Sequence, residues 1–257
     1  MTKKIYLIIL VLFSLSINQY YAYRGVFPID SFLIFDSGYN VMSGHHPFKD
    51  YWLITGPLLD YIQSLFFLVF KVNWFSYALH ASLLNMFLAL FSYYFFLKLG
   101  LKSIFALIYS LGVAILAYPS IGTPFVDHHA VIFSVMALYS FIIGILYKKN
   151  LFWFLIPFFL TLSFFSKQIP SSYISGIFIL IIPYYFIMHK NELNKKNILS
   201  LFIGCFFSFV LILIPFLVNQ IPFNNFLIQY IYYPYSLGEI RFNELEFSFA
   251  NLIAQFK

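Results

Sequence analysis

The sequence has little charge and almost no cysteine. Of its 257 residues only 9% are charged, whereas a soluble domain carries about 25%. The single cysteine, Cys205, lies inside an apolar run, which excludes an intrachain disulfide framework and any paired-cysteine metal or redox motif. The chain also lacks an HExxH zinc motif, a Gly-rich phosphate loop and a GxSxG nucleophile elbow. These absences argue against the corresponding classes of enzyme.

Apolar and aromatic residues take the place of charge. Hydrophobic residues make up 62% of the chain and aromatic residues 23%. Their apolar surface is larger than the core of a soluble protein can bury, so we expect the surplus to face lipid. The formal charge of +6 comes from short lysine clusters between apolar runs, without a basic stripe or a nucleic-acid motif. Such clusters are typical of topology signals, and we expect no nucleic-acid partner. The composition predicts an all-α polytopic membrane protein.

The apolar runs predict about seven transmembrane helices. Lys3 and Lys4 precede the first run, and no small-x-small cleavage site follows it, so we expect an uncleaved span with a cytoplasmic N-terminus. Some runs are shorter than the ~20 residues of a perpendicular span. The predicted spans lie near 5–23, 74–97, 104–118, 130–147, 151–166, 171–188 and 198–218.

The segment 57–72 is apolar but short. Asp60, Gln63 and Lys71 fall off a stripe of apolar residues that recur at helical spacing, namely Leu58, Leu59, Ile62, Leu65, Phe66 and Val69. Its apolar part would rise only about 21 Å, against a hydrocarbon core of about 30 Å. We therefore expect a juxtamembrane helix that lies along the interface instead of crossing it.

The distribution of lysine supports this topology. With 57–72 on the surface, nine lysines fall on the inner side, namely Lys3, Lys4, Lys98, Lys102, Lys148, Lys149, Lys190, Lys195 and Lys196. Such a positive-inside bias places the other connections outside the cytoplasmic membrane. The prediction is one domain over 1–257, with outer loop 1 at 24–73, outer loop 2 at 119–129, an outer turn at 166–171 and a C-terminal outer segment at 219–257.

Acidic and histidine residues gather on the outer side. Acids contribute little to membrane orientation, so insertion rules do not force this asymmetry. An outward-facing active site would produce it, and so would outer loops that are simply longer and more polar. The outer acids are Asp30, Asp36, Asp50, Asp60, Asp127, Glu239, Glu244 and Glu246, and the outer histidines are His45, His46, His128 and His129.

Each outer segment holds candidate site residues. Asp36 sits beside aromatic residues at the membrane surface, where desolvation would raise its pKa towards that of a general base, although it could equally cap a helix. Asp127 and the two histidines after it could contact a metal or phosphate, or Asp127 could be an N-cap. Lys167 could hold a phosphate oxygen or reach lipid headgroups.

Together these segments resemble the GT-C superfamily of polytopic glycosyltransferases, and most closely its family 39-like group, which includes protein O-mannosyltransferases and lipid A aminoarabinose transferases. The likeness lies in short motifs, namely an acid after the first span, a Gly–Pro–Asp stretch, a Gly-Pro-Leu-Leu helix start, an acid before a later span and a Lys-Gln turn. The matching residues here are Asp36; Gly44, Pro47 and Asp50; Gly56–Leu59; Asp127; and Lys167 with Gln168. Ser37 follows the first acid where a second acid would favour a metal site. Because the family has further spans, the resemblance also implies that this chain is a piece of a longer protein.

The resemblance implies sugar transfer from a polyprenyl-phosphate donor to a lipid, glycan or protein acceptor on the outer face. It implies Asp36 as general base, and it leaves a divalent cation open. Two alternatives stay open, namely a lipid or glycan transporter or flippase, and a noncatalytic subunit. For a transporter, the polar candidates within the spans are Asn18, Gln19, His80 and Asn85. The donor-phosphate residues would be Lys167, Gln168, Lys49 and Arg241, and the pocket residues Asp50, His45, His46, Asp127, His128 and His129.

Overall fold

The computed structural model describes residues 2–25, 30, 32–189 and 195–243, without the side chains of residues 2, 3 and 241–243. These residues form helices and contain no strand, apart from an isolated bridge between Pro47 and Tyr51. The helices are α1 (Thr2–Ala22), α2 (Leu33–Met42), α3 (Leu58–Phe70), α4 (Trp74–Lys98), α5 (Ser103–Ala117), α6 (Val126–Tyr147), α7 (Asn150–Ser166), α8 (Gln168–Met188), α9 (Lys195–Val218), α10 (Phe223–Phe226), the π-helix η2 (Leu227–Tyr232) and α11 (Tyr233–Asn243).

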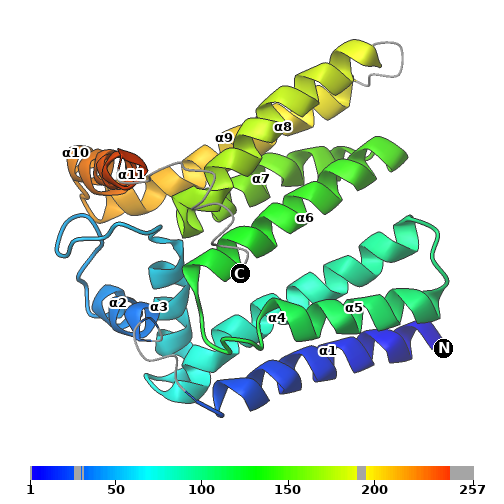
Figure 1. Cartoon of the computed structure of the whole chain (residues 1–257), viewed down its shortest axis with the longest axis horizontal. Coiled ribbons are helices and arrows are strands. Elements are labelled where there is room, and N and C mark those ends of the chain that lie inside the picture. Colours follow the sequence, from blue (N-terminus) through cyan, green and yellow to red (C-terminus); the bar gives the residue numbers. More distant parts are fainter. Residues whose placement is uncertain (1, 26–29, 31, 190–194, 244–257) are drawn as a thin grey trace, which may run out of the picture.

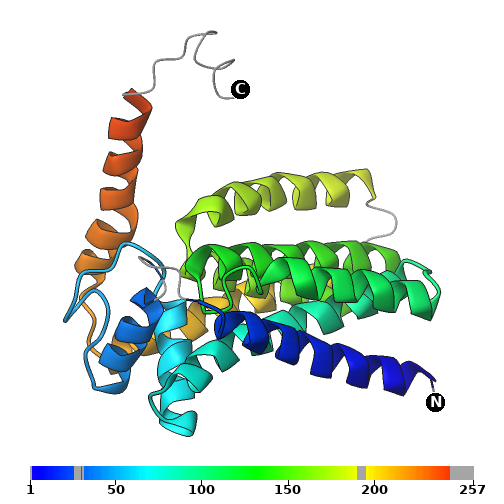
Figure 2. The same ribbon diagram turned by 60° about the horizontal axis from the view of Figure 1, so that its bottom comes forward.

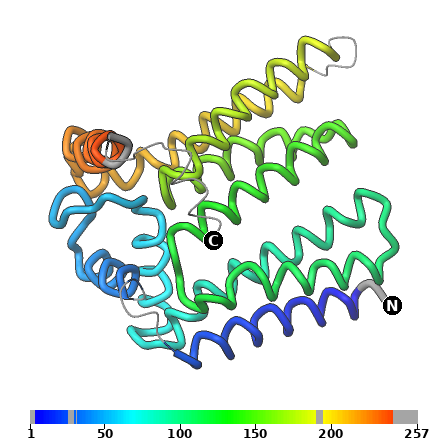
Figure 3. The backbone as a smooth tube through the Cα atoms, in the orientation of Figure 1, coloured from blue at the N-terminus to red at the C-terminus, as the bar shows by residue number. Residues whose placement is uncertain are grey.

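The long helices form two packed groups. Helices α1, α4 and α5 contact one another, helices α6 to α9 form the second group, and α4 contacts α6 between them (Figure 1). The chain reverses direction from each long helix to the next, so alternate connections between them come to the same end (Figure 3). We call the end that carries residues 32–57, 118–125 and 166–170 the loop end. Near it, α10, η2 and α11 form a rod at a steep angle to the bundle (Figure 2).

The structure supports a membrane protein. Five helices, α1, α4, α6, α8 and α9, are long and apolar enough to cross a bilayer. Their outward surface is apolar, as the 73% exposure of Leu180 and the 72% exposure of Val218 illustrate. Helices α5 and α7, with 15 and 17 residues, coincide with the two remaining predicted spans but rise only about 22–26 Å. The predicted count of seven therefore stays a proposal.

Helix α3 forms where the short apolar segment predicts a helix, and its polar face points inward. Asp60 and Gln63 are fully buried against the protein, while Leu65, Leu68 and Val69 are 60–71% exposed. This is the reverse of a helix on a soluble protein, whose apolar stripe faces the core. The arrangement suits a helix whose outer face contacts lipid.

Polar side chains join the spans within the first group. Asn18 of α1 donates to Ser82 of α4 at 2.9 Å and to the carbonyl of Gly122 at 3.1 Å. Asn85 of α4 donates to the carbonyls of Ser14 and Ala114 at 3.3 and 2.9 Å. Such hydrogen bonds contribute about 0.6 kcal/mol each to association between membrane helices. These hydrogen bonds fix the register of α4 against α1 and α5. They therefore also fix the position of the loop end relative to these helices.

Candidate functional site

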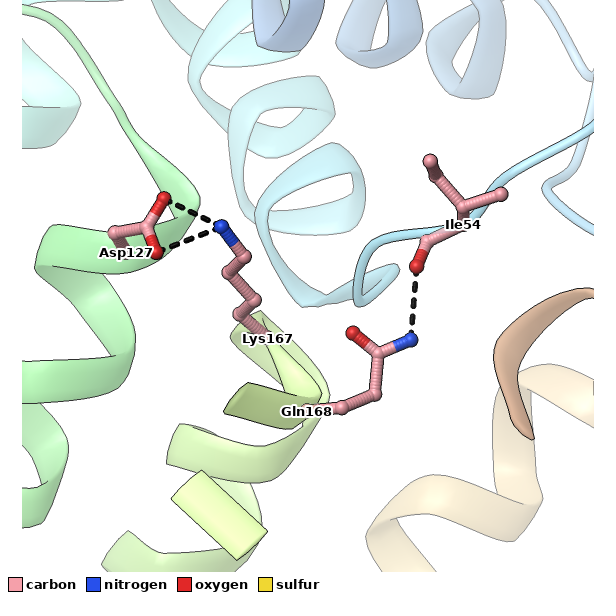
Figure 4. A network of polar contacts seen from close by, with 4 residues as sticks. All are labelled: Ile54, Asp127, Lys167 and Gln168. Carbon is pink, nitrogen blue, oxygen red and sulfur yellow. Dashed lines mark hydrogen bonds and ion pairs between the residues drawn. The ribbon is translucent and has the colours of Figure 1, made fainter. Parts of the chain in front are cut away.

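Two of the predicted outer segments meet in an ion pair. Lys167 lies between α7 and α8 in an extended backbone conformation (φ −158°, ψ 138°), and its side chain points towards the start of α6 (Figure 4). Its Nζ contacts both carboxylate oxygens of Asp127 at 2.7 Å (Figure 4). The two side chains are 32% and 39% exposed, so the pair is open to a ligand. Lys167 and Asp127 are 40 residues apart in sequence, and the fold brings them together.

Asp127 and Asp36 each lie inside a helix, which excludes the alternative that either is an N-cap. Helix α6 begins at Val126 after Phe125, four residues before the predicted span, and α2 begins after Phe32. Both acids occupy the first turn of their helix, where the helix dipole favours negative charge. Neither carboxylate is therefore needed as a side-chain cap, and both can face a ligand.

An apolar groove of about 480 Å³ starts beside the ion pair. Asp127 and His128 line one end of it, and the rest of its wall is largely apolar, contributed by α4, α5 and α6. Leu88, Leu116 and Val131 are among these apolar residues, and Tyr139 lies two turns further along α6. The groove therefore combines a charged mouth with a lining suited to a hydrocarbon chain.

Gln168 points away from Lys167 and joins three segments (Figure 4). Its amide group donates to the carbonyls of Ile54 and Tyr230, both at 2.8 Å. Nearby, the backbone N–H of Gly56 donates to the carbonyl of Ser166 at 3.1 Å. Both amide hydrogens of Gln168 are used in these contacts, so this residue supports the site and leaves no donor for a phosphate. We therefore assign Gln168 a supporting role in place of the predicted contact with phosphate.

Gly56 permits the close approach of outer loop 1 to α7. A Cβ at this position would lie 1.8 Å from the carbonyl oxygen of Phe165, a backbone atom that cannot move alone. The Gly-Pro-Leu-Leu start of α3 is therefore set directly against the end of α7, next to Lys167. The C-terminal segment closes the same region, because Gln229 of η2 accepts the N–H of Leu53 at 2.9 Å.

Outer loop 1 also holds a carboxyl that the sequence did not single out as a site residue. Asp60 of α3 is fully buried and accepts hydrogen bonds from the hydroxyls of Ser37 at 2.7 Å and Tyr51 at 2.8 Å. Burial raises the pKa of Asp60 to about 7, although both hydroxyl donors oppose the rise. This carboxyl joins α2, the loop and α3, and it is partly protonated at neutral pH.

Asp36 lies next to this buried group but faces solvent. It is exposed in the first turn of α2, with the amide of Asn40 at 3.4 Å. Its neighbour Ser37 is the donor to Asp60. The negative charge of Asp36 also contributes to the rise in the pKa of Tyr51, after burial and Asp60. Asp36 is thus an accessible carboxylate on a helix that Asp60 anchors.

The turn at 45–50 orders three more predicted residues. Asp50 accepts the backbone N–H of His46 at 2.7 Å, and the His46 ring stacks on Tyr61 with centroids 6.1 Å apart. Burial lowers the pKa of His46, and Asp50 opposes that effect. Lys49 donates to the carbonyl of Asn219 at 2.9 Å, and His45 is exposed. The turn therefore presents a neutral imidazole and an exposed lysine at the loop end.

The three adjacent residues at the start of α6 point in three directions. Asp127 binds Lys167, while His128 lines the groove between the rings of Tyr118 and Phe125. His129 is buried inside the bundle, with its Nε2 3.1 Å from Nε2 of His80. Within the described residues no three His, Cys, Asp or Glu side chains gather in a group that could hold a metal ion. The described residues therefore offer the possible metal ion no third ligand beside Asp127, and His129 contributes to helix packing.

A buried polar chain continues from His129. His80 of α4 contacts Oε1 of Gln63 through Nδ1 at 3.0 Å, and His129 contacts the hydroxyl of Tyr118 through its own Nδ1. This chain joins α3, α4, the end of α5 and α6 beneath the loop end. It was hidden in the sequence because its members are far apart and lie within apolar runs. Of the remaining predicted residues, the side chain of Arg241 lies outside the described part, as do Glu244 and Glu246.

Comparison with known proteins gave no match to any family model, curated protein or solved structure.

Proposed function

We propose that the chain is a membrane glycosyltransferase that moves a sugar from a polyprenyl-phosphate donor to a lipid, glycan or protein acceptor at the loop end. We take the loop end to be the extracytoplasmic face of the cytoplasmic membrane, because the α4–α5 and α6–α7 connections lie at the other end (Figure 1) and hold Lys98, Lys102, Lys148 and Lys149. The proposal starts from the resemblance to the GT-C superfamily, family 39-like group, and takes all seven long helices as spans.

The observation that carries the proposal is the ion pair of Asp127 and Lys167 at the mouth of the apolar groove. A polyprenyl phosphate has the same two parts, a hydrocarbon chain and a charged head. The groove suits the chain, and the ammonium of Lys167 suits the phosphate, to which a lysine binds as a compact point charge. Asp127 holds that ammonium in place before a ligand arrives.

The transfer step assigns complementary tasks to Asp36 and Lys167. The acceptor hydroxyl oxygen attacks the anomeric carbon, the bond from that carbon to the phosphate oxygen breaks, and the hydroxyl proton passes to the Asp36 carboxylate. The leaving polyprenyl phosphate gains negative charge, which Lys167 stabilises. Attack opposite the leaving group inverts the anomeric centre. His45, His46 and Asp50 would border the acceptor side, and Lys49 stays a second candidate for the donor phosphate.

The contacts of the polar span residues make transport the weaker alternative. Asn18, Asn85 and His80 are fully buried, and each bonds to a neighbouring element. Gln19 contacts Ser82 at 3.2 Å. Residues committed to helix packing in this way do not line a polar path across the membrane. A noncatalytic subunit would need the loop end for binding a partner, and loss of Asp36 and Asp127 would then leave sugar transfer in cells unchanged.

The groove provides a sharp test of the donor. The full chain in lipid vesicles is supplied with radiolabelled polyprenyl-phosphate sugars of long and short chain length, and release of polyprenyl phosphate is followed. Val131→Phe fills the groove and should raise the KM for long-chain donors more than for short ones. Leu138→Phe is the matched control, because Leu138 has the same 45% exposure as Val131 but does not line the groove. Equal effects of the two substitutions, or no transfer from any donor, would refute the proposal.

A further inference from the structure

The end of the bundle opposite the loop end holds a second hollow. It has a volume of about 810 Å³ and lies between α1, the α4–α5 turn and the end of α6. Its polar lining consists of Tyr6, Tyr94, Lys98, Lys102, Ser103 and Tyr147. Both charged residues of this lining are cationic, and the remaining lining residues are apolar or glycine. The hollow therefore favours an anion.

Lys98 is held in place by aromatic rings. Its Nζ lies 5.4 Å from the ring centroid of Tyr94 and 4.7 Å from that of Tyr147, within the range of cation–π attraction. The hydroxyl of Tyr147 also donates to the carbonyl of Lys98 at 2.7 Å. A solvated surface lysine makes no such contacts with aromatic rings. The ammonium is thus positioned before a ligand binds, which reduces the entropy lost on binding.

The α4–α5 turn brings the second lysine to the same hollow. Gly100 has a φ of +90°, and the N–H of Leu101 donates to the carbonyl of Phe96 at 3.2 Å, as in a Schellman helix end. The chain then enters α5 directly after Lys102, and no side chain caps that helix. The first-turn N–H groups of a helix favour anions, which adds to the attraction of the two lysines.

We propose that this hollow binds the phosphate of an anionic phospholipid headgroup. The hollow lies at the ends of α4 and α6, two helices long enough to span a bilayer, so it is at the depth of lipid headgroups. A phosphate with net negative charge matches two cations, and the phenols of Tyr6, Tyr94 and Tyr147 suit the interface between apolar and aqueous layers. A soluble phosphate shares this chemistry, and the experiment separates the two sources. The inference does not depend on sugar transfer.

The test measures lipid binding to the full chain in a neutral detergent by native mass spectrometry. Phosphatidylglycerol is titrated, with phosphatidylcholine, glycerol 3-phosphate and inorganic phosphate as separate arms. We expect phosphatidylglycerol to bind more tightly than phosphatidylcholine, and the double substitution Lys98→Gln with Lys102→Gln to weaken it by about tenfold or more. The matched control, Lys149→Gln with Lys195→Gln, removes two exposed lysines at the same end and should leave the affinity unchanged.

The arms give distinct outcomes. Tight binding of glycerol 3-phosphate would support the phosphate site and identify a soluble source. Equal binding of the two phospholipids, or equal losses in the test and control variants, would overturn the proposal. If the double substitution prevents folding, Lys102→Gln alone serves as the test, because the side chain of Lys102 is exposed and not needed for packing. Lys98→Arg should retain binding, since it keeps the charge.

Discussion

The buried carboxyl of Asp60 should make the stability of the protein depend on pH. Its pKa is raised from 3.8 to about 7, so between these values the folded protein binds a proton that the unfolded chain releases. Stability is then greatest at low pH, falls as the pH rises towards 7 and is constant above it. Because each pKa unit is worth about 1.4 kcal/mol, the whole loss is about 4 kcal/mol.

Asp60→Asn removes this titration while keeping the shape of the side chain. The amide oxygen can accept one of the two hydroxyls of Ser37 and Tyr51, and its N–H₂ can donate to the other. We therefore expect the variant to match the wild type only below about pH 4 and to be more stable at higher pH, by a margin that grows by about 2.7 kcal/mol between pH 5 and 7 and reaches about 4 kcal/mol above pH 7. The difference between the two proteins isolates Asp60 from the other acids, whose titrations are common to both.

The assay is thermal unfolding of the full chain in detergent micelles from about pH 5 to about pH 8, at one fixed scan rate, since membrane proteins often unfold irreversibly. Asp36→Asn is the control, because Asp36 is exposed and on the adjacent helix. Its unfolding curve should follow that of the wild type. If the curves of wild type and Asp60→Asn run parallel over the whole pH range, the pH-dependent role of Asp60 is refuted.

Three further predictions concern stability. Gly56→Ala should lower the free energy of unfolding by about 3 kcal/mol or prevent folding, because the added Cβ meets a backbone oxygen of α7. Gly176→Ala, on the open face of α8, is the control and should be neutral or stabilising by up to about 1 kcal/mol. Thermal unfolding measures both. Gln168→Leu should cost about 1 kcal/mol in the same assay, because the carbonyls of Ile54 and Tyr230 lose the donor that joins them to the start of α8. Lys167→Gln and Asp127→Asn should each change stability by less than about 1 kcal/mol, because the pair is one-third exposed; a large loss would mean that the pair serves stability instead of a ligand.

Helix positions could be predicted from the sequence because the apolar runs are long. Helices α4, α7 and α9 lie within about three residues of the predicted runs, and α3 forms where a short helix is predicted. Helix α2 was not among the predicted helices, because it has only ten residues and they include Gly38 and three polar side chains. Its formation depends on tertiary contacts, since Ser37 bonds to Asp60 and Gly38 packs on Gln63.

The candidate site could be predicted only where polar residues stand out in outer segments. Asp127 and Lys167 were chosen for that reason, and the fold brings them together. Asp60 was recognised as polar but assigned no role, because no local pattern indicates that a helix lies with its polar face inward. His129 was assigned to a pocket from its neighbours, yet one residue along a helix turns a side chain by about 100°, enough to place it in the core.

The central claim is tested most directly by the rate of sugar transfer from a defined polyprenyl-phosphate sugar by the full chain in lipid vesicles, with Asp36→Asn compared to the wild type. Asp30→Asn, which removes an acid from the same loop, is the control. The account predicts transfer by the wild type and the control and a loss of about a hundredfold or more in Asp36→Asn, the share typical of a general base. Near-wild-type transfer by a correctly inserted Asp36→Asn protein would contradict it.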